Sequence, residues 1–300
     1  MSLHAIETHG SGGHGHHATG QKVSIQFEDL DQQNESYIVG MWSFLVTEIM
    51  FFGALFLAYT LYRVVYFNTY LEAHHFLDVK MGTINTFVLL SSSLSAALGV
   101  YAAQHGQRAK VIMALAFTCV CAFGFMVVKY FEYTNKIHEG IYPDQNFNYA
   151  KALTIYHEHH AKEGGSSEEN PRANVAWKYL EEARKGPEAV FVDAPKEGYD
   201  GRIASPEAGT VRVAAKTPAW AKFDVEAGRA KLFFSLYFSM TGLHGIHVVI
   251  GIICMVTLML LYGTKHPAVD DYMPMEMVGL YWHFVDLVWI FLFPLMYLIS

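Results

Sequence analysis

The chain has 300 residues, of which 52% are hydrophobic and only 16% are charged, and its formal net charge is −7. Soluble proteins usually carry about 25% charged residues, so this composition excludes an ordinary soluble enzyme and a disordered chain. A nucleic-acid-binding domain usually shows a basic patch and a high isoelectric point, and the acidic balance argues against one. We therefore expect no nucleic-acid partner and predict a membrane protein.

Five windows of the sequence are long and apolar enough to cross a membrane, which takes about 20 residues of helix. They cover residues 37–66, 81–103, 111–133, 231–262 and 275–299. Most charged residues lie instead near the N-terminus and between the third and fourth windows. These patterns predict an all-α fold, a polytopic membrane helix bundle with five transmembrane helices and a polar, partly helical extramembrane insertion.

The sequence divides into four expected parts. Residues 1–36 form a flexible tail, residues 37–142 hold three transmembrane helices, residues 143–228 form the insertion, and residues 229–300 hold two more helices. Inside the insertion, residues 149–162 have a helical pattern, and Asn170-Pro171 resembles an N-cap followed by a first-turn proline, which predicts a second helix to about residue 185. Residues 210–214 are a candidate strand.

The positive residues indicate an orientation, because short cytoplasmic loops are enriched in Lys and Arg. Arg108, Lys110 and Lys265 lie in short loops on the side of the N-terminus, whereas residues 67–79, read as the one short loop on the other side, contain neither residue type. We therefore expect a cytoplasmic N-terminus, with the insertion and the C-terminus on the opposite face.

The N-terminal tail is rich in histidine, and such tracts can chelate a transition metal. Its Gly-rich sequence offers no preformed geometry, so we favour a flexible tail that binds no metal. The histidines concerned are His4, His9, His14, His16 and His17.

Glu48 lies deep inside the first apolar window. A carboxylate at that depth costs on the order of 3 kcal/mol, so we expect Glu48 to be un-ionised or partnered across the bundle. Two interpretations stay open: a hydrogen bond between helices, or a site for a proton, an ion or a lipid.

Three polar pairs inside the windows share a spacing of three residues, which places both members on one helix face. Haem ligation, a zinc site and a proton relay are possible uses. We favour neutral histidines that donate to a carbonyl or hydroxyl of a neighbouring helix, and we expect no metal there. The pairs are His244 with His247, His283 with Asp286, and Lys129 with Glu132.

Small residues recur on two windows at helical spacing, which lets helices approach closely in lipid. We expect these stripes, and the aromatic residues of the last window, to serve helix packing. They are Ser92, Ala96, Gly99 and Ala103, then Ser235, Ser239 and Gly242, and finally Trp282, Trp289 and Tyr297.

One stretch in each window resembles subunit III of the haem–copper oxidases, most closely that of cytochrome c oxidase. The resemblance covers about residues 37–142 and 228–299. Its motifs are residues 47–52, Asn85-Thr86 with residues 89–92, Gly124 with Lys129 and Glu132-Tyr133, residues 241–248 with Gly251, and residues 281–289.

This resemblance implies a non-catalytic subunit of a proton-pumping oxidase in the aerobic respiratory chain. Such a subunit packs beside oxidase subunits I and II, whose haem and copper do the chemistry, and binds no redox cofactor itself. It binds structural phospholipid between its helices and supports proton uptake. The implied location is a bacterial inner membrane, with the insertion in the periplasm.

The same resemblance assigns roles to particular residues. Lipid or other intramembrane functions are implied for Glu48, His244, His247, Trp282, His283 and Asp286. Helix packing is implied for Asn85, Gly124, Glu132, Gly242 and Gly245.

The chain departs from the longer members of the family at two places. They have two further helices before the helix of Glu48, which line the lipid cleft, so we expect an open cleft or one completed by another chain. They also lack the long insertion. We predict that the insertion contacts a cytochrome c domain or a donor complex, the alternative being a mobile loop.

Other functions remain possible from the residues alone. A quinol oxidase subunit III or an accessory protein of nitric oxide reductase would share the motifs. A transporter using Glu48 would need an inverted repeat and broken helices, and neither is visible. A di-haem membrane cytochrome would need more intramembrane histidines.

Overall fold

The computed structural model describes residues 26–144, 147–162, 175–184, 219–269 and 271–298, and it contains helices and turns but no strand in these ranges. In chain order the elements are α1 Leu30–Val65, α2 Phe67–His74, α3 Val79–Gln104, α4 Arg108–Glu139, α5 Tyr149–Lys162, α6 Val175–Arg184, α7 Ala219–Thr264, the 3-10 turn η2 Pro267–Val269, α8 Met273–Phe293 and the π-helical turn η3 Pro294–Leu298.

Five of these helices, α1, α3, α4, α7 and α8, are long and apolar enough to cross a membrane. The predicted all-α bundle with five spans is therefore confirmed. The expected parts that lie outside the described residues are most of the tail with its histidines, the start of the helix predicted from Asn170, and the candidate strand at residues 210–214.

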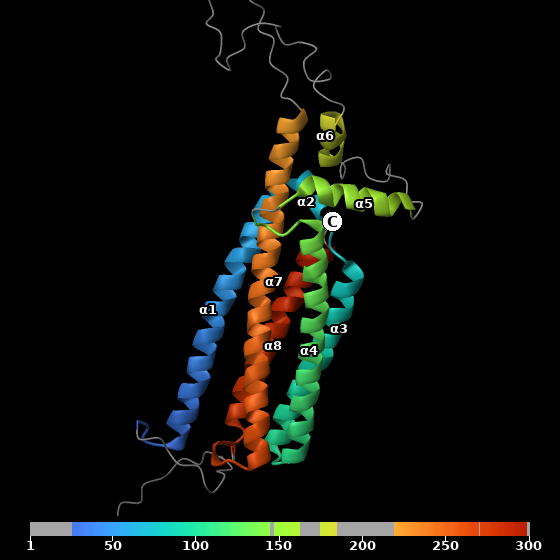
Figure 1. Cartoon of the computed structure of the whole chain (residues 1–300). Helices are drawn as coiled ribbons and strands as arrows, with labels where there is room; N and C mark the ends of the chain where they lie inside the picture. Colours follow the sequence, from blue (N-terminus) through green and yellow to red (C-terminus); the bar gives the residue numbers. More distant parts are fainter. Residues whose placement is uncertain (1–25, 145–146, 163–174, 185–218, 270, 299–300) are drawn as a thin grey trace, which may run out of the picture.

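Four of the spans form the core of the bundle, and α1 leans on its side (Figure 1). Helix α3 packs on α4 and α8, while α7 packs on α4 and α8 from the other side. Helix α1 contacts α7, α8 and α2, and most of its apolar side chains remain exposed. Exposed apolar faces of this kind are what a membrane-spanning helix presents to lipid or to a partner helix.

Short polar signals set the ends of several helices. Asp29 caps α1, its side chain accepting the backbone N–H of Gln32 at 2.7 Å. Asp78 caps α3 in the same way, accepting from the first-turn amides of Lys80 and Met81. Gly140 ends α4 with a φ of 81°, a left-handed conformation that glycine adopts without steric cost.

The segment expected as a short loop at residues 67–79 is largely helical. Helix α2 occupies residues 67–74, directly after α1. It packs against α7, and Thr69, Tyr70, Ala73 and His74 are buried. Residues 67–79 read as a loop because the segment is short and mixed in polarity, and its burial comes from partners distant in sequence.

The fourth span begins earlier than expected. Helix α7 starts at Ala219, not near Lys231, so residues 219–228, which were expected at the end of the insertion, are helical and continuous with the fourth span. With 46 residues it is about 69 Å long at about 1.5 Å per residue, roughly twice the thickness of the hydrocarbon core. Its N-terminal part therefore extends past the other spans, and α6 lies along it (Figure 1).

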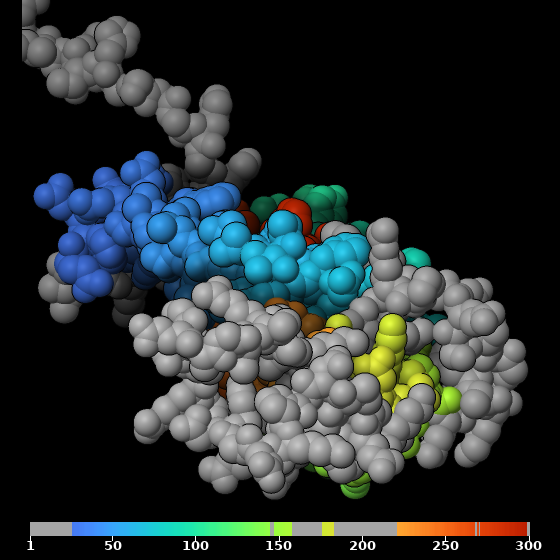
Figure 2. Space-filling model, turned by 90° about the horizontal axis from the view of Figure 1, so that it is seen from above, coloured from blue at the N-terminus to red at the C-terminus, as the bar shows by residue number. Residues whose placement is uncertain are grey.

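The described insertion helices pack on this chain. Helix α5 has the predicted bounds of residues 149–162, and α6 covers Val175–Arg184. Tyr149, Leu153, Ala176 and Leu180 are buried in the same core as the bundle. Neighbouring subunits are thus not needed to bury these residues. Figure 2 looks at the end of the bundle that carries the insertion. In this view α6 and α5 (yellow and green) lie below the row formed by α1 and α2 (blue to cyan).

Close helix contacts occur at some small residues and not at others. A Cβ at Gly82, Gly99, Gly251 or Gly279 would come within 2.8 Å of a side-chain atom of a neighbouring helix. The stripe that includes Ser92, Ala96 and Gly99 is buried as expected. Gly124 and Gly245, for which packing was implied, face open space in this chain, because α4 and α7 turn other residues toward their neighbours.

A glycine-to-alanine pair on α7 tests this packing. Gly251→Ala places a methyl group 2.8 Å from the ring of Trp282, and we expect it to lower stability by about 1–3 kcal/mol, the usual cost of overpacking. Gly245→Ala is the matched control, with no atom within 4 Å, and it should change stability by less than about 0.5 kcal/mol. Thermal unfolding in detergent, followed by size-exclusion chromatography, measures both. Equal effects of the two changes would contradict the proposed contact.

Candidate functional site

Glu48 meets a partner on another helix. Its Oε2 on α1 lies 3.3 Å from Nε2 of His247 on α7, and the two side chains are 22% and 11% exposed. The structure therefore agrees with the expectation that Glu48 is partnered across the bundle. The pair lies at one of the few places where α1 touches α7.

The contact of the other ring nitrogen of His247 determines how many protons the pair carries. Nδ1 lies 2.9 Å from the carbonyl oxygen of Leu243, and because a carbonyl only accepts, Nδ1 carries a hydrogen. A carboxylate facing a bare Nε2 would bring two acceptors together. One proton therefore belongs between Glu48 and His247, on either the carboxyl group or the imidazole, and the pair is neutral overall in both cases.

Aromatic rings close around this pair. The ring of Phe52 lies 5.4 Å from that of His247, and Phe284 lies 6.4 Å from Phe52. The hydroxyl of Tyr281 donates to the backbone oxygen of His247 at 3.0 Å. The pair therefore has an apolar wall on the bundle side and partial exposure on the other, which suits contact with a lipid or with another chain.

The surroundings of His244 differ from those of His247. His244 is fully buried between Phe125 and Trp289, with ring centroids 5.5 and 5.2 Å away. Neither of its nitrogens has a hydrogen-bond partner among the described residues. The expected bond to a carbonyl or hydroxyl of a neighbouring helix is found for neither residue: Nδ1 of His247 meets the Leu243 carbonyl of its own helix, and aromatic rings surround His244.

The polar residues of the last span attach α8 to α3. The indole N–H of Trp282 donates to Oγ of Ser92 at 3.1 Å, and that of Trp289 donates to Oγ1 of Thr86 at 3.1 Å. Nδ1 of His283 lies 2.7 Å from Oγ of Ser93. Trp282 and His283, which the sequence grouped with Glu48, thus serve the α3–α8 contact.

Two further residues of the motifs are buried and have polar side-chain atoms without a hydrogen-bond partner among the described residues. Asp286 is 4% exposed, and its Oδ1 has no partner among the described residues. Asn85 is fully buried, and neither atom of its amide group has a partner there. Burial fits the packing role implied for Asn85.

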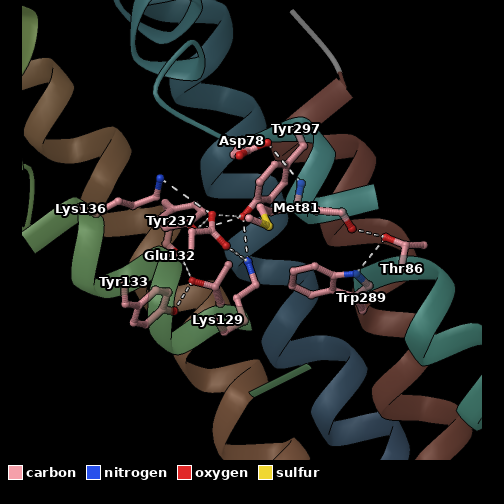
Figure 3. A network of polar contacts seen from close by, with 12 residues as sticks. Asp78, Met81, Thr86, Lys129, Glu132, Tyr133, Lys136, Tyr237, Trp289 and Tyr297 are labelled. Atoms are coloured by element: carbon pink, nitrogen blue, oxygen red, sulfur yellow. Dashed lines mark hydrogen bonds and ion pairs between the residues drawn. The ribbon is translucent and has the colours of Figure 1, made fainter. Parts of the chain in front are cut away.

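A network of charges lies at the end of the bundle that carries the insertion (Figure 3). Glu132 of α4 accepts from Lys129 at 2.6 Å, from Tyr237 of α7 at 2.7 Å and from Tyr297 at 2.6 Å, and Lys136 lies 3.8 Å away. The ammonium of Lys129 also donates to the hydroxyl of Tyr297 and lies 4.6 Å from the ring centre of Trp289.

The sequence revealed only part of this network. The spacing of Lys129, Glu132 and Lys136 places all three on one face of α4, but Lys136 was not singled out. Tyr237 and Tyr297 come from elements 105 and 165 positions away from Glu132, and nothing local marks them as its partners. Tyr297 was expected only to pack.

The described residues contain no group of three or more His, Cys, Asp or Glu that could hold a metal ion. The tail histidines lie outside these residues, so the expectation that they bind no metal stays a prediction.

Comparison with known proteins identifies a family and individual relatives that this chain resembles. The sequence model of a family described as "Cytochrome c oxidase subunit III" matches residues 31–160 and 221–300. These ranges take in most or all of every span, and they leave out residues 161–220, which include α6.

Individual relatives match a shorter part. A "Cytochrome c oxidase subunit 3" of Alkalihalophilus pseudofirmus is 37% identical over 68 residues, which are 23% of this chain and 33% of the relative. A "Probable quinol oxidase subunit 3" of Staphylococcus epidermidis is 41% identical over 70 residues, 23% of this chain and 34% of the relative. A "Cytochrome bo(3) ubiquinol oxidase subunit 3" of Pseudomonas aeruginosa is 37% identical over 68 residues, 23% of this chain and 32% of the relative. Each match thus spans about a third of the relative.

Substitutions at Glu48 test its pairing with His247. Glu48→Gln keeps one acceptor and gains donors for Nε2, so we expect stability within about 0.5 kcal/mol of the native chain. Glu48→Leu leaves Nε2 of His247 without its partner and should cost about 1–3 kcal/mol. A double-mutant cycle with His247→Phe, read by thermal unfolding in detergent, measures the coupling. Additive effects of the two single changes would show that the residues do not interact.

Removal of the carboxylate at Glu132 should be much more damaging. Glu132→Gln leaves Lys129 and Lys136 buried without their counter-charge, and breaking a buried ion pair costs about 3–5 kcal/mol. Glu35→Gln on the exposed start of α1 is the control, and it should change stability by less than about 0.5 kcal/mol. Yield of folded chain after detergent extraction and its unfolding temperature provide the readouts. A folded Glu132→Gln chain with native stability would contradict the role of the carboxylate.

Proposed function

The chain belongs to the cytochrome c oxidase subunit III family, and from this premise we propose that it is the non-catalytic subunit III of a haem–copper oxidase in a bacterial respiratory chain. The observation that carries the proposal is the family match, which takes in all five spans over residues 31–160 and 221–300. In this proposal haem and copper belong to partner subunits I and II, and this chain stabilises subunit I beside them.

The exposed surface of the spans supports such a role. Large apolar side chains such as Leu57, Phe87 and Val120 are exposed on α1, α3 and α4. A chain with this much apolar surface needs lipid or partner helices around it. We assign the open side of the Glu48–His247 pair to phospholipid contact and to support of proton uptake by the complex.

The positions of the positive residues support the proposed orientation. Arg108 and Lys110 at the start of α4, and Lys265 after α7, lie at the end of the bundle where α1 begins (Figure 1). At the opposite end, Lys129 and Lys136 are buried and engaged with Glu132. We therefore place the N-terminus in the cytoplasm and the insertion and C-terminus in the periplasm.

The proposed contact with a cytochrome c domain or a donor complex now concerns a smaller part of the insertion. The aromatic residues of α6 are engaged within this chain: the ring of Trp177 stacks on His157 of α5 at 4.0 Å, and Tyr179 receives the ammonium of Lys222 at 5.3 Å. The face of α6 that these rings cover is not available to a partner, so we assign the donor contact to the rest of the insertion.

A quinol oxidase is the second candidate. Two of the relatives, from Staphylococcus epidermidis and Pseudomonas aeruginosa, are named as quinol oxidase subunits at similar identity. Relatives named for either kind of oxidase match this chain at similar identity, so the distinction rests on the electron donor of the whole complex.

Purification of the native complex tests both candidates. We expect the affinity-tagged chain, extracted in a mild detergent, to co-purify with a haem- and copper-containing subunit I and with subunit II. Oxygen uptake driven by reduced cytochrome c, together with a copper-binding motif in subunit II, identifies the first candidate. Uptake driven only by a quinol identifies the second, and isolation without any haem protein contradicts the oxidase assignment.

A further inference from the structure

Glu72 connects the part of the chain that matches the family to a helix that lies outside the match. Its carboxylate on α2 accepts the backbone N–H of Ala176 at 3.2 Å and that of Trp177 at 3.4 Å, both in the first turn of α6. Glu72 is only 4% exposed. First-turn amides of a helix have no partner within the helix, so a side chain from a different helix supplies the cap of α6.

A second carboxylate lies near this contact. Glu226 of α7 accepts a hydrogen bond from the hydroxyl of Thr69 on α2, and it interacts electrostatically with Glu72. The guanidinium of Arg229 donates to Glu226 at 2.5 Å, so this cation is engaged by Glu226. Glu72 therefore faces a like charge on α7 and the N–H groups of α6.

Most of the remaining titratable neighbours of α2 are phenols and histidines, and the cations nearby, Arg63 of α1 and Lys136 of α4, interact with Tyr59 and with the backbone oxygen of Phe76. On α5, the phenols of Tyr149 and Tyr156 interact electrostatically with Glu72. Tyr59 and Tyr62 of α1, and Tyr66 between α1 and α2, interact electrostatically with Tyr70 of α2. Two histidines belong to the same region: His75, directly after α2, lies beside Tyr156, and His157 of α5 is stacked on Trp177. Because histidine in general can change its charge near neutral pH, both must be separated from Glu72 in any test.

We propose that Glu72 is a proton-controlled latch, which fastens α6 of the insertion to α2 while the carboxyl group is protonated and loosens it as the pH at that face rises. The latch is independent of which electron donor the complex uses. Because protonation strengthens the contact, the form in which α6 is fastened to α2 is favoured in a proton-rich compartment.

The electrostatics give the sign of the effect. The pKa of Glu72 is raised from its ordinary value of 4.5 to about 8, chiefly by burial; the charge of Glu226 adds to the rise, and the Ala176 and Trp177 amides oppose it. With α6 released, Glu72 is hydrated and its pKa returns toward the ordinary value. The latched form therefore binds the proton more tightly, so latching is strongest below about pH 4.5, weakens by up to about tenfold per pH unit from there to about pH 8, and is constant above.

Hydrogen exchange of the α6 amides measures the latch in the full chain, within its complex or in lipid nanodiscs. After correction for intrinsic exchange, protection of residues 175–184 should fall about tenfold or more between about pH 6 and about pH 8. Glu72→Gln keeps a neutral acceptor, so its protection should stay high across this range. Glu181→Gln, an exposed position of α6, is the matched control and should retain the native pH dependence.

The outcomes separate Glu72 from the histidines. If Glu72→Gln keeps the whole pH dependence, His75 or His157 is the titrating group and the proposal is wrong. Protection that is constant with pH in the native chain overturns it equally.

A second readout leaves Glu72 intact, in case Glu72→Gln does not fold. Ala176→Cys places a thiol at a position that is fully buried in the latched form, and Lys178→Cys places one at an exposed position of the same helix. The modification rate at position 176, divided by that at position 178 at the same pH, should rise about tenfold or more over the same range. A constant ratio contradicts the latch.

Discussion

The carboxylate of Glu132 is the point on which the outer half of the bundle depends. It receives an ammonium from its own helix and phenols from α7 and from the end of the last span, so three elements meet at one buried charge. Two lysines with one carboxylate would be an unfavourable set in hydrocarbon. Stacked aromatic rings and phenolic hydroxyls make it tolerable, because they replace the water that the ammonium groups have lost.

This network also fixes the short helix α2 at the base of the insertion. Lys136 donates to the backbone oxygen of Phe76, and His74 lies 2.9 Å from the backbone oxygen of Tyr297. Helix α2 in turn holds α7 through Thr69 and α6 through Glu72. The insertion is thus attached to the membrane bundle by a continuous series of polar contacts, in addition to the apolar packing of Tyr149 and Leu153.

The sequence predicted the parts of the fold that follow from local composition. The five spans follow from apolar length alone, and α5 from its helical periodicity. Helix α2 and the early start of α7 were missed because both are polar segments, and the elements they contact, α7 and α6, lie far away in the chain. No window of sequence contains that information.

The candidate site shows the same limit. The depth of Glu48 predicts that it needs a partner, and the spacing of His244 and His247 places both on one face. Which of the two histidines meets Glu48 depends on the rotation of α7 against α1, and the structure selects His247. His244 turns to Phe125 and Trp289 instead, so two residues that look equivalent in sequence have different environments.

The length of α7 has a mechanical consequence. It is one helix from Ala219, beside α6, to Thr264 at the far end, with no proline inside it. A continuous helix of this kind acts as a stiff rod, so its outer end and His247 move together. Since they are about 42 Å apart at about 1.5 Å per residue, a tilt of about 5° about His247 displaces the outer end by about 4 Å. The insertion therefore has a long lever arm on the helix that holds His247 against Glu48, and a small rotation within the membrane becomes a large excursion outside it.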